Sequence, residues 1–147
     1  MKYDKIIFIC TANTFLSPTA EAIYRTKAGD GMPTPYSRGL VVLFQEPISP
    51  KVNLLLSRYD MQTSNHELSR KLEQDDITEQ TLLLTMTLSE KVQIMEEYEQ
   101  PGQVFTLGEF TGVETDVADP YGAEEEVYIA CFMDLAKRID LVIQQIT

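Results

Sequence analysis

A cysteine followed by a short polar loop and the start of a helix carries the most reactive chemistry in this sequence. Cys10 ends an apolar run, Ser17 suits the N-cap of a helix, and Pro18 suits its first position. A loop between a strand and a helix start directs backbone N–H groups at the positive end of the helix dipole, which favours anions, phosphate above all. The same field lowers the pKa of a thiol toward the reactive thiolate. The sequence therefore predicts an anion-binding loop over residues 11–17, with Cys10 as its nucleophile.

The elements that must position this loop follow from the hydrophobic pattern. Apolar runs of strand length alternate with helical periodicity, an order typical of α/β proteins with a parallel sheet. We expect a three-layer α/β/α sandwich with about four parallel strands, in a single domain over residues 1–147. The expected strands are 5–9, 36–42, 81–87 and 104–107, and the expected helices are 18–28, 51–59, 89–98 and 124–146. The buried stripe of the last helix is expected to be Val127, Cys131, Leu135, Ile139 and Val142.

The cysteine loop resembles the signature of the low-molecular-weight protein tyrosine phosphatases. That signature runs from a strand through Cys, five residues, Arg, Ser or Thr, and Pro into a helix, and Cys10 and residues 17–21 match it. Leu16 stands where the family has Arg. Within the family, the bacterial branch near the arginine phosphatases is the most similar. The resemblance implies a phosphorylated protein or a small phosphate or oxyanion as ligand, and no cofactor.

A second motif of the same family precedes the last helix. Asp119-Pro120-Tyr121-Gly122 resembles the Asp-Pro-Tyr/Phe segment in which the family's Asp protonates the leaving group. The resemblance implies that Asp119 acts first as the acid and then as the base for water. Tyr121 is a further candidate site residue in this motif.

Backbone N–H groups are the expected phosphate donors, because in-line attack by a thiolate requires hydrogen bonds to three equatorial oxygens. The resemblance implies that the side chains of Asn13, Ser17 and Ser37 support the strained shape of the loop. The donors are expected from Thr11, Ala12, Asn13, Thr14, Phe15, Leu16 and Ser17.

The replacement of Arg by Leu16 decides which activity we expect. An Arg would give two charge-assisted hydrogen bonds of roughly 1.5–3 kcal/mol each, and their loss corresponds to about 10²–10⁴ in rate. The sequence therefore predicts a phosphatase whose activity is strongly impaired. One alternative is a catalytically inactive pseudophosphatase that binds an anionic partner. Another is a flavodoxin-like FMN-binding protein, because Thr11–Thr14 also resembles the flavodoxin phosphate loop.

Arg38 is a candidate to replace the missing cation. It lies in a predicted strand beside the loop, and strand ends in open parallel sheets face the ligand crevice. Its guanidinium could enter the site from the side, where the family has a small residue. The alternative is that Arg38 points to solvent or pairs with one of the 23 acidic side chains.

Composition limits these interpretations. The 147 residues carry a formal net charge of −11, which argues against nucleic acid and anionic membranes as partners. No apolar run approaches the length of a membrane span and the N-terminus does not resemble a signal peptide, so we expect a cytoplasmic location. Cys10 and Cys131 are expected to be free thiols, and His66 a capping or surface residue without a metal. The expected assembly is a monomer or a weak dimer.

Overall fold

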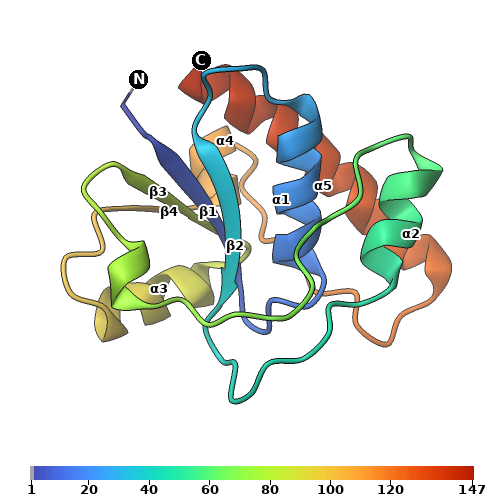
Figure 1. Ribbon diagram of the computed structural model, residues 1–147, viewed down its shortest axis with the longest axis horizontal. Coiled ribbons are helices and arrows are strands. Elements are labelled where there is room, and N and C mark those ends of the chain that lie inside the picture. Colours follow the sequence, from blue (N-terminus) through green and yellow to red (C-terminus); the bar gives the residue numbers. More distant parts are fainter. Residues whose placement is uncertain (1) are drawn as a thin grey trace.

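Residues 2–147 are described by a computed structural model, in which four parallel strands form one sheet (Figure 1). The strands lie in the order β2-β1-β3-β4. Their bounds are Lys5–Cys10 for β1, Thr34–Gly39 for β2, Thr81–Thr85 for β3 and Gln103–Thr106 for β4. β1 is central, with β2 paired on one side and β3 on the other. The parallel sheet predicted from the sequence is confirmed.

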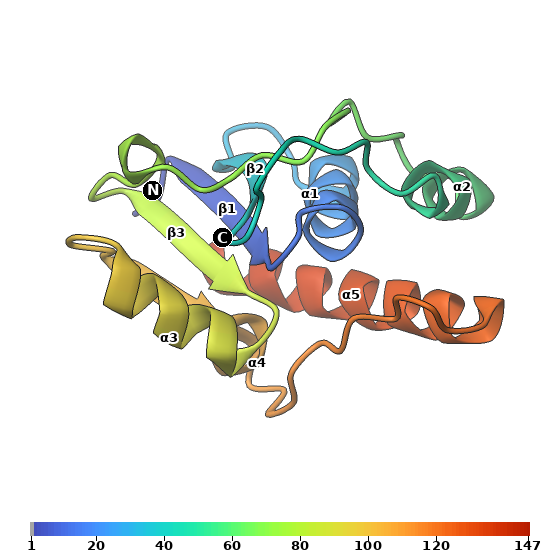
Figure 2. The same cartoon turned by 90° about the horizontal axis from the view of Figure 1, so that it is seen from below.

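Helices cover both faces of this sheet (Figure 2). Helices α1 and α5 pack on one face and α3 on the other, so the three-layer arrangement is also confirmed. A short 3₁₀ helix, η1, precedes β3. The bounds are Leu16–Lys27 for α1, Lys51–Arg58 for α2, Gln74–Asp76 for η1, Leu88–Glu97 for α3, Leu107–Thr111 for α4 and Glu125–Ile146 for α5.

Strand β1 is apolar along its length because both faces of the sheet are covered. Ile6, Phe8 and Cys10 belong to the core cluster shared with α1 and α5. Ile7 and Ile9 belong to the second cluster, on the α3 side. Since side chains alternate along a strand, this register directs Cys10 toward the α1 and α5 side of the sheet.

Helix α1 begins two residues earlier than the sequence predicts. Its first residue is Leu16 and its N-cap is Phe15, which makes no side-chain capping bond. Ser17, the expected N-cap, lies instead in the first turn and is fully buried. Its hydroxyl faces the Cys10 sulfur at 2.9 Å, so this side chain serves the loop rather than the helix end.

Strand β4 ends one residue before the expected boundary, and the short helix α4, which the sequence analysis did not predict, follows directly. Thr106 Oγ1 accepts from the Glu109 N–H and the Glu109 carboxylate accepts from the Thr106 N–H, both at 2.9 Å. These reciprocal bonds form a capping box. The Thr-x-x-Glu spacing was the sequence signal for this helix.

The buried stripe of α5 differs from the expected one in its first half. Tyr128 and Phe132 are buried, whereas Val127 is 49% exposed and Cys131 is half-buried. Both stripes have helical spacing, and the aromatic pair is selected because it packs against rings from the cysteine loop and from the end of α2. Although α5 spans 22 residues, no helix within residues 2–147 is apolar enough over a sufficient length to cross a membrane.

Candidate active site

One buried side chain, Asn13, holds the loop between β1 and α1. Its backbone is left-handed, with φ of 58°, a conformation that Asn tolerates. Its amide nitrogen donates to Ser17 Oγ at 2.8 Å and to Ser37 Oγ at 3.1 Å. Its carbonyl oxygen accepts from the Arg70 N–H at 2.8 Å and lies 2.9 Å from His66 Nε2. The three side chains expected to support the loop are therefore bonded to one another.

His66 lies against this loop, and its expected role as a capping or surface residue is wrong. Because the carbonyl oxygen of Asn13 can only accept, His66 Nε2 is the donor to it. His66 Nδ1 lies 3.8 Å from Oε1 of the buried Glu21, whose other oxygen pairs with Arg25 at 2.7 Å. The imidazole, which comes from a distant segment, thus supports the loop through Asn13, and a buried carboxylate of α1 lies beside that imidazole.

The sulfur of Cys10 is enclosed by the loop. The residue is 5% exposed, and its Sγ accepts from the Asn13 N–H at 3.2 Å. Burial raises the pKa of Cys10 above its ordinary value, hydrogen bonds from Ser17 and Asn13 oppose the rise, and the Glu90 carboxylate adds to it. The lowered pKa predicted from the helix dipole is therefore wrong, because desolvation of the thiolate outweighs the donors around it.

A cavity of about 160 Å³ lies at Cys10. It brings the thiol together with Asp119 and with most of the predicted loop, and it includes one carboxylate that the sequence analysis did not select, Glu90. Within residues 2–147, no Lys, Arg or His contributes to its walls. The lining residues are Cys10, Thr11, Ala12, Thr14, Phe15, Leu16, Thr87, Glu90, Val117 and Asp119.

Glu90 enters this cavity from the first turn of α3. Its Oε1 accepts from the N–H groups of Met86 and Thr87, both at 3.0 Å, and its Oε2 accepts from Thr11 Oγ1 at 2.8 Å. Thr87 and Glu90 form a capping box, and burial raises the pKa of the Glu90 carboxyl. The Thr-x-x-Glu spacing could have predicted the capping box. Only the pairing of β1 with β3 shows that it faces the cysteine loop.

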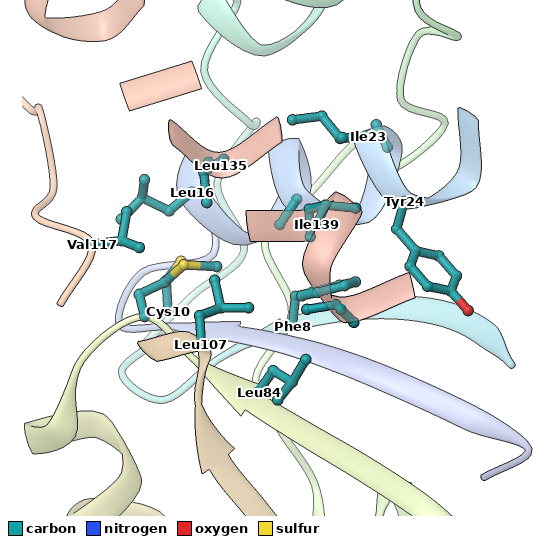
Figure 3. Close-up of a cluster of buried hydrophobic side chains, with 14 of the residues drawn as sticks. Phe8, Cys10, Leu16, Ile23, Tyr24, Leu84, Leu107, Val117, Leu135 and Ile139 are labelled. Carbon is teal, nitrogen blue, oxygen red and sulfur yellow. The ribbon is translucent and has the colours of Figure 1, made fainter. Parts of the chain in front are cut away.

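Leu16 forms an apolar wall of the cavity. Its side chain is 4% exposed and belongs to the same core cluster as Cys10 and Val117. Figure 3 shows it turned toward Val117. The neighbouring Phe15 packs edge-on against Tyr128, with ring centroids 5.0 Å apart. Neither Leu16 nor Phe15 has a side-chain donor for an anion, so both can contribute only their backbone N–H groups.

Asp119 lines the cavity from the segment that leads to α5. Its Oδ1 accepts from the Tyr121 N–H at 3.0 Å. The Val117 N–H donates to the Met86 carbonyl at 2.9 Å and thereby fixes this segment beside the end of β3. Tyr121 itself is 88% exposed and lies outside the cavity lining.

Arg38 turns away from the cavity. Its Nε lies 3.3 Å from Asp76 Oδ2, and its guanidinium also donates to the Ser37 carbonyl at 2.7 Å. It lines a separate hollow beside Phe44. This is the alternative in which Arg38 pairs with an acidic side chain. Among residues 2–147, no cationic side chain therefore lines the cavity at Cys10.

Comparison with known proteins finds relatives that match most of this chain. A family model described as low molecular weight phosphotyrosine protein phosphatase matches residues 5–147. The low molecular weight protein-tyrosine-phosphatase PtpB of Staphylococcus haemolyticus is 30% identical to this chain over 131 residues. The match covers 89% of this chain and 91% of that protein.

Two solved structures extend the comparison to three dimensions. A low molecular weight protein tyrosine phosphatase from T. tengcongensis superposes with a TM-score of 0.86 at 33% identity, over 96% of this chain and 98% of that one. The YwlE arginine phosphatase from Geobacillus stearothermophilus superposes with a TM-score of 0.86 at 30% identity, over 96% and 91%. The match in family, order of elements and fold decides against the flavodoxin-like alternative. The chain belongs to the low molecular weight phosphotyrosine protein phosphatase family.

Proposed function

We propose that this chain binds a phosphorylated protein or a small oxyanion at the loop over residues 11–17 and hydrolyses phosphomonoesters through Cys10 only slowly. Leu16 replaces the phosphate-binding Arg of the family signature. The observation that carries the proposal is the composition of the cavity. A nucleophile and a candidate acid face the same space, and within residues 2–147 no cationic side chain lines it.

The reaction would proceed in two steps through a phosphocysteine. The thiolate of Cys10 attacks phosphorus while the bond to the leaving oxygen breaks, and the carboxylic acid of Asp119 gives its proton to that oxygen. The carboxylate of Asp119 then takes a proton from water as the water attacks phosphorus, which releases inorganic phosphate and restores the thiolate. Backbone N–H groups of the loop would stabilise the equatorial oxygens in both steps.

Two features of the site are expected to slow this two-step reaction. The raised pKa of Cys10 leaves little thiolate at neutral pH, so the first step begins from a small fraction of the protein. Leu16 cannot supply the bidentate charge that offsets repulsion between a thiolate and a phosphate dianion. The expected result is anion binding with slow turnover.

The test is turnover of p-nitrophenyl phosphate, together with vanadate binding, by the wild-type chain, Leu16→Arg and Leu16→Met. We expect Leu16→Arg to raise kcat/KM by about 10²–10⁴, the range that two charge-assisted hydrogen bonds supply. The volume-matched Leu16→Met should behave like wild type, and Cys10→Ser should abolish turnover. Wild-type turnover equal to that of Arg-containing relatives would overturn the proposal.

A pseudophosphatase that binds an anionic partner without turnover is the second candidate, and the raised pKa of Cys10 favours it. Mass spectrometry of protein quenched during incubation with p-nitrophenyl phosphate separates the two. A phosphocysteine adduct that is absent from Cys10→Ser would identify a slow enzyme. Vanadate binding without an adduct or turnover would identify the pseudophosphatase.

A further inference from the structure

Glu90 places a negative charge beside the loop that would hold the anion. Its Oε2 accepts from Thr11 Oγ1 at 2.8 Å, and Thr11 is the first residue of that loop. The residue is 7% exposed, so solvent screens its charge less than that of a surface carboxylate. Burial raises the pKa of the Glu90 carboxyl, while two backbone N–H groups and one hydroxyl that donate to the side chain oppose this rise and favour its ionised form.

No cation in the cavity lining offsets this charge within the described residues. The titratable groups that share the cavity with Glu90 are Cys10 and Asp119, so its ionisable side chains are a thiol and two carboxyls. Lys91, the next residue of α3, pairs with Glu109 at 2.9 Å, outside the cavity. The attractive groups that remain are backbone N–H groups and helix N-terminal dipoles, which amount to partial charges.

Starting from the proposed oxyanion site, we propose that Glu90 is a specificity-determining residue that restricts the cavity to oxyanions with a single negative charge. Loop N–H groups and the helix dipole attract the first charge of the ligand. A second charge would be held beside the Glu90 carboxylate, and no cationic side chain among the described residues lines the cavity to neutralise it. The favoured ligands are therefore a phosphodiester or a singly ionised phosphomonoester, and the disfavoured ones are dianions.

Glu90 also caps α3, so the test must separate charge from structure. Glu90→Gln removes the charge and keeps an oxygen for the N–H groups of Met86 and Thr87, while its amide can donate to Thr11 Oγ1. Glu109 is a matched control, because it makes the same capping box at the start of α4 and lies outside the cavity. Glu109→Gln should therefore reproduce any general effect of removing a capping carboxylate.

The experiment measures binding of two small probes at neutral pH by isothermal titration or NMR. Sulfate is a dianion and dimethyl phosphate is a monoanion, and neither is hydrolysed by the route proposed above. We expect Glu90→Gln to strengthen sulfate binding relative to dimethyl phosphate by about tenfold or more, given the strength of a charge pair near a protein surface. Glu109→Gln should leave the ratio of the two affinities at the wild-type value.

Each outcome has a distinct meaning. An unchanged ratio in Glu90→Gln, with both probes bound, overturns the assignment of Glu90 and leaves the proposed oxyanion site intact. A change of equal size in Glu109→Gln shows that the effect comes from the helix caps and also overturns it. If neither probe binds to any variant, the proposed oxyanion site is overturned, and the inference about Glu90 is overturned with it.

Discussion

At the scale of single residues, the reactivity of Cys10 is decided by opposing effects on one sulfur atom. The loop supplies donors from Asn13 and Ser17, as in a site that stabilises a thiolate. Burial and the carboxylate of Glu90 act in the opposite direction and prevail. A guanidinium next to the thiolate would lower the pKa of Cys10, and the side chain of Leu16 provides none.

Alkylation of Cys10 tests this balance. A raised pKa means that the thiol is protonated at neutral pH. The rate of alkylation by iodoacetamide should therefore keep rising as the pH is increased beyond 9.0, the ordinary pKa of a cysteine thiol. Leu16→Arg should move the profile to lower pH, because a nearby positive charge favours the thiolate. The measurement uses a Cys131→Ser background, since Cys131 is the other thiol and burial raises its pKa to about 12. A wild-type profile with its midpoint at or below neutral pH would contradict the expectation.

At the scale of elements, strands β3 and β4 are each followed by a helix that begins with a capping box. Thr87 and Glu90 cap α3, and Thr106 and Glu109 cap α4. The local pattern is equivalent in both, but only the α3 copy faces the cysteine loop, because β3 is the neighbour of β1. Position in the sheet thus turns one capping residue into part of the site.

Helix α5 offers a test of which stripe faces the core. Phe132 is fully buried and stacks on Tyr59 with ring centroids 5.2 Å apart, whereas Val127 is 49% exposed. Phe132→Ala should lower the free energy of unfolding by about 3–5 kcal/mol through lost burial and a cavity. Val127→Ala, at a position that the sequence pattern predicted as buried, should change it by less than about 1 kcal/mol. Urea denaturation of both variants gives the two values, and a larger cost at position 127 would favour the stripe predicted from the sequence.

At the scale of the whole molecule, acidic side chains outnumber basic ones by 23 to 12. The formal net charge is −11, and the folded state brings these charges together. Several cations are already engaged in ion pairs, including Arg25 with Glu21, Arg138 with Asp134 and Lys91 with Glu109. The remaining negative charge repels itself, and it repels any dianion that approaches the cavity.

Salt should therefore stabilise the protein at neutral pH. Raising NaCl from about 10 mM to about 150 mM shortens the Debye length from roughly 30 Å to roughly 8 Å and screens the repulsion. We expect Tm to rise by about 2–4 °C, which corresponds to roughly 1 kcal/mol in a chain of this size. Near the calculated pI of about 4.4 the same change should have little effect, because the net charge is close to zero. A Tm that falls with salt at neutral pH would show that attractive ion pairs outweigh the net repulsion.

The sequence by itself determined the order of the four strands and of the α-helices other than α4, the cysteine loop and the family. These rest on local patterns, namely periodicity, the spacing after Cys10 and the Asp-Pro-Tyr motif at Asp119, and such patterns are complete within short windows of the chain. The supporting trio of Asn13, Ser17 and Ser37 was also available from sequence, through resemblance. In the structure the side-chain amide of Asn13 donates hydrogen bonds to the hydroxyls of Ser17 and Ser37.

Only the tertiary structure decided the electrostatics of the cavity. Thr11 and Glu90 are 79 residues apart, and Asn13 and His66 are 53 apart, so no local window contains either pair. Parallel pairing places the ends of β1, β2 and β3 at one edge of the sheet, and the segments that leave those ends meet there. The depth at which Cys10 is buried likewise depends on how α1 and α5 cover the sheet. A pKa depends on desolvation and on charges brought close in space, and neither is encoded in the spacing of residues along the chain.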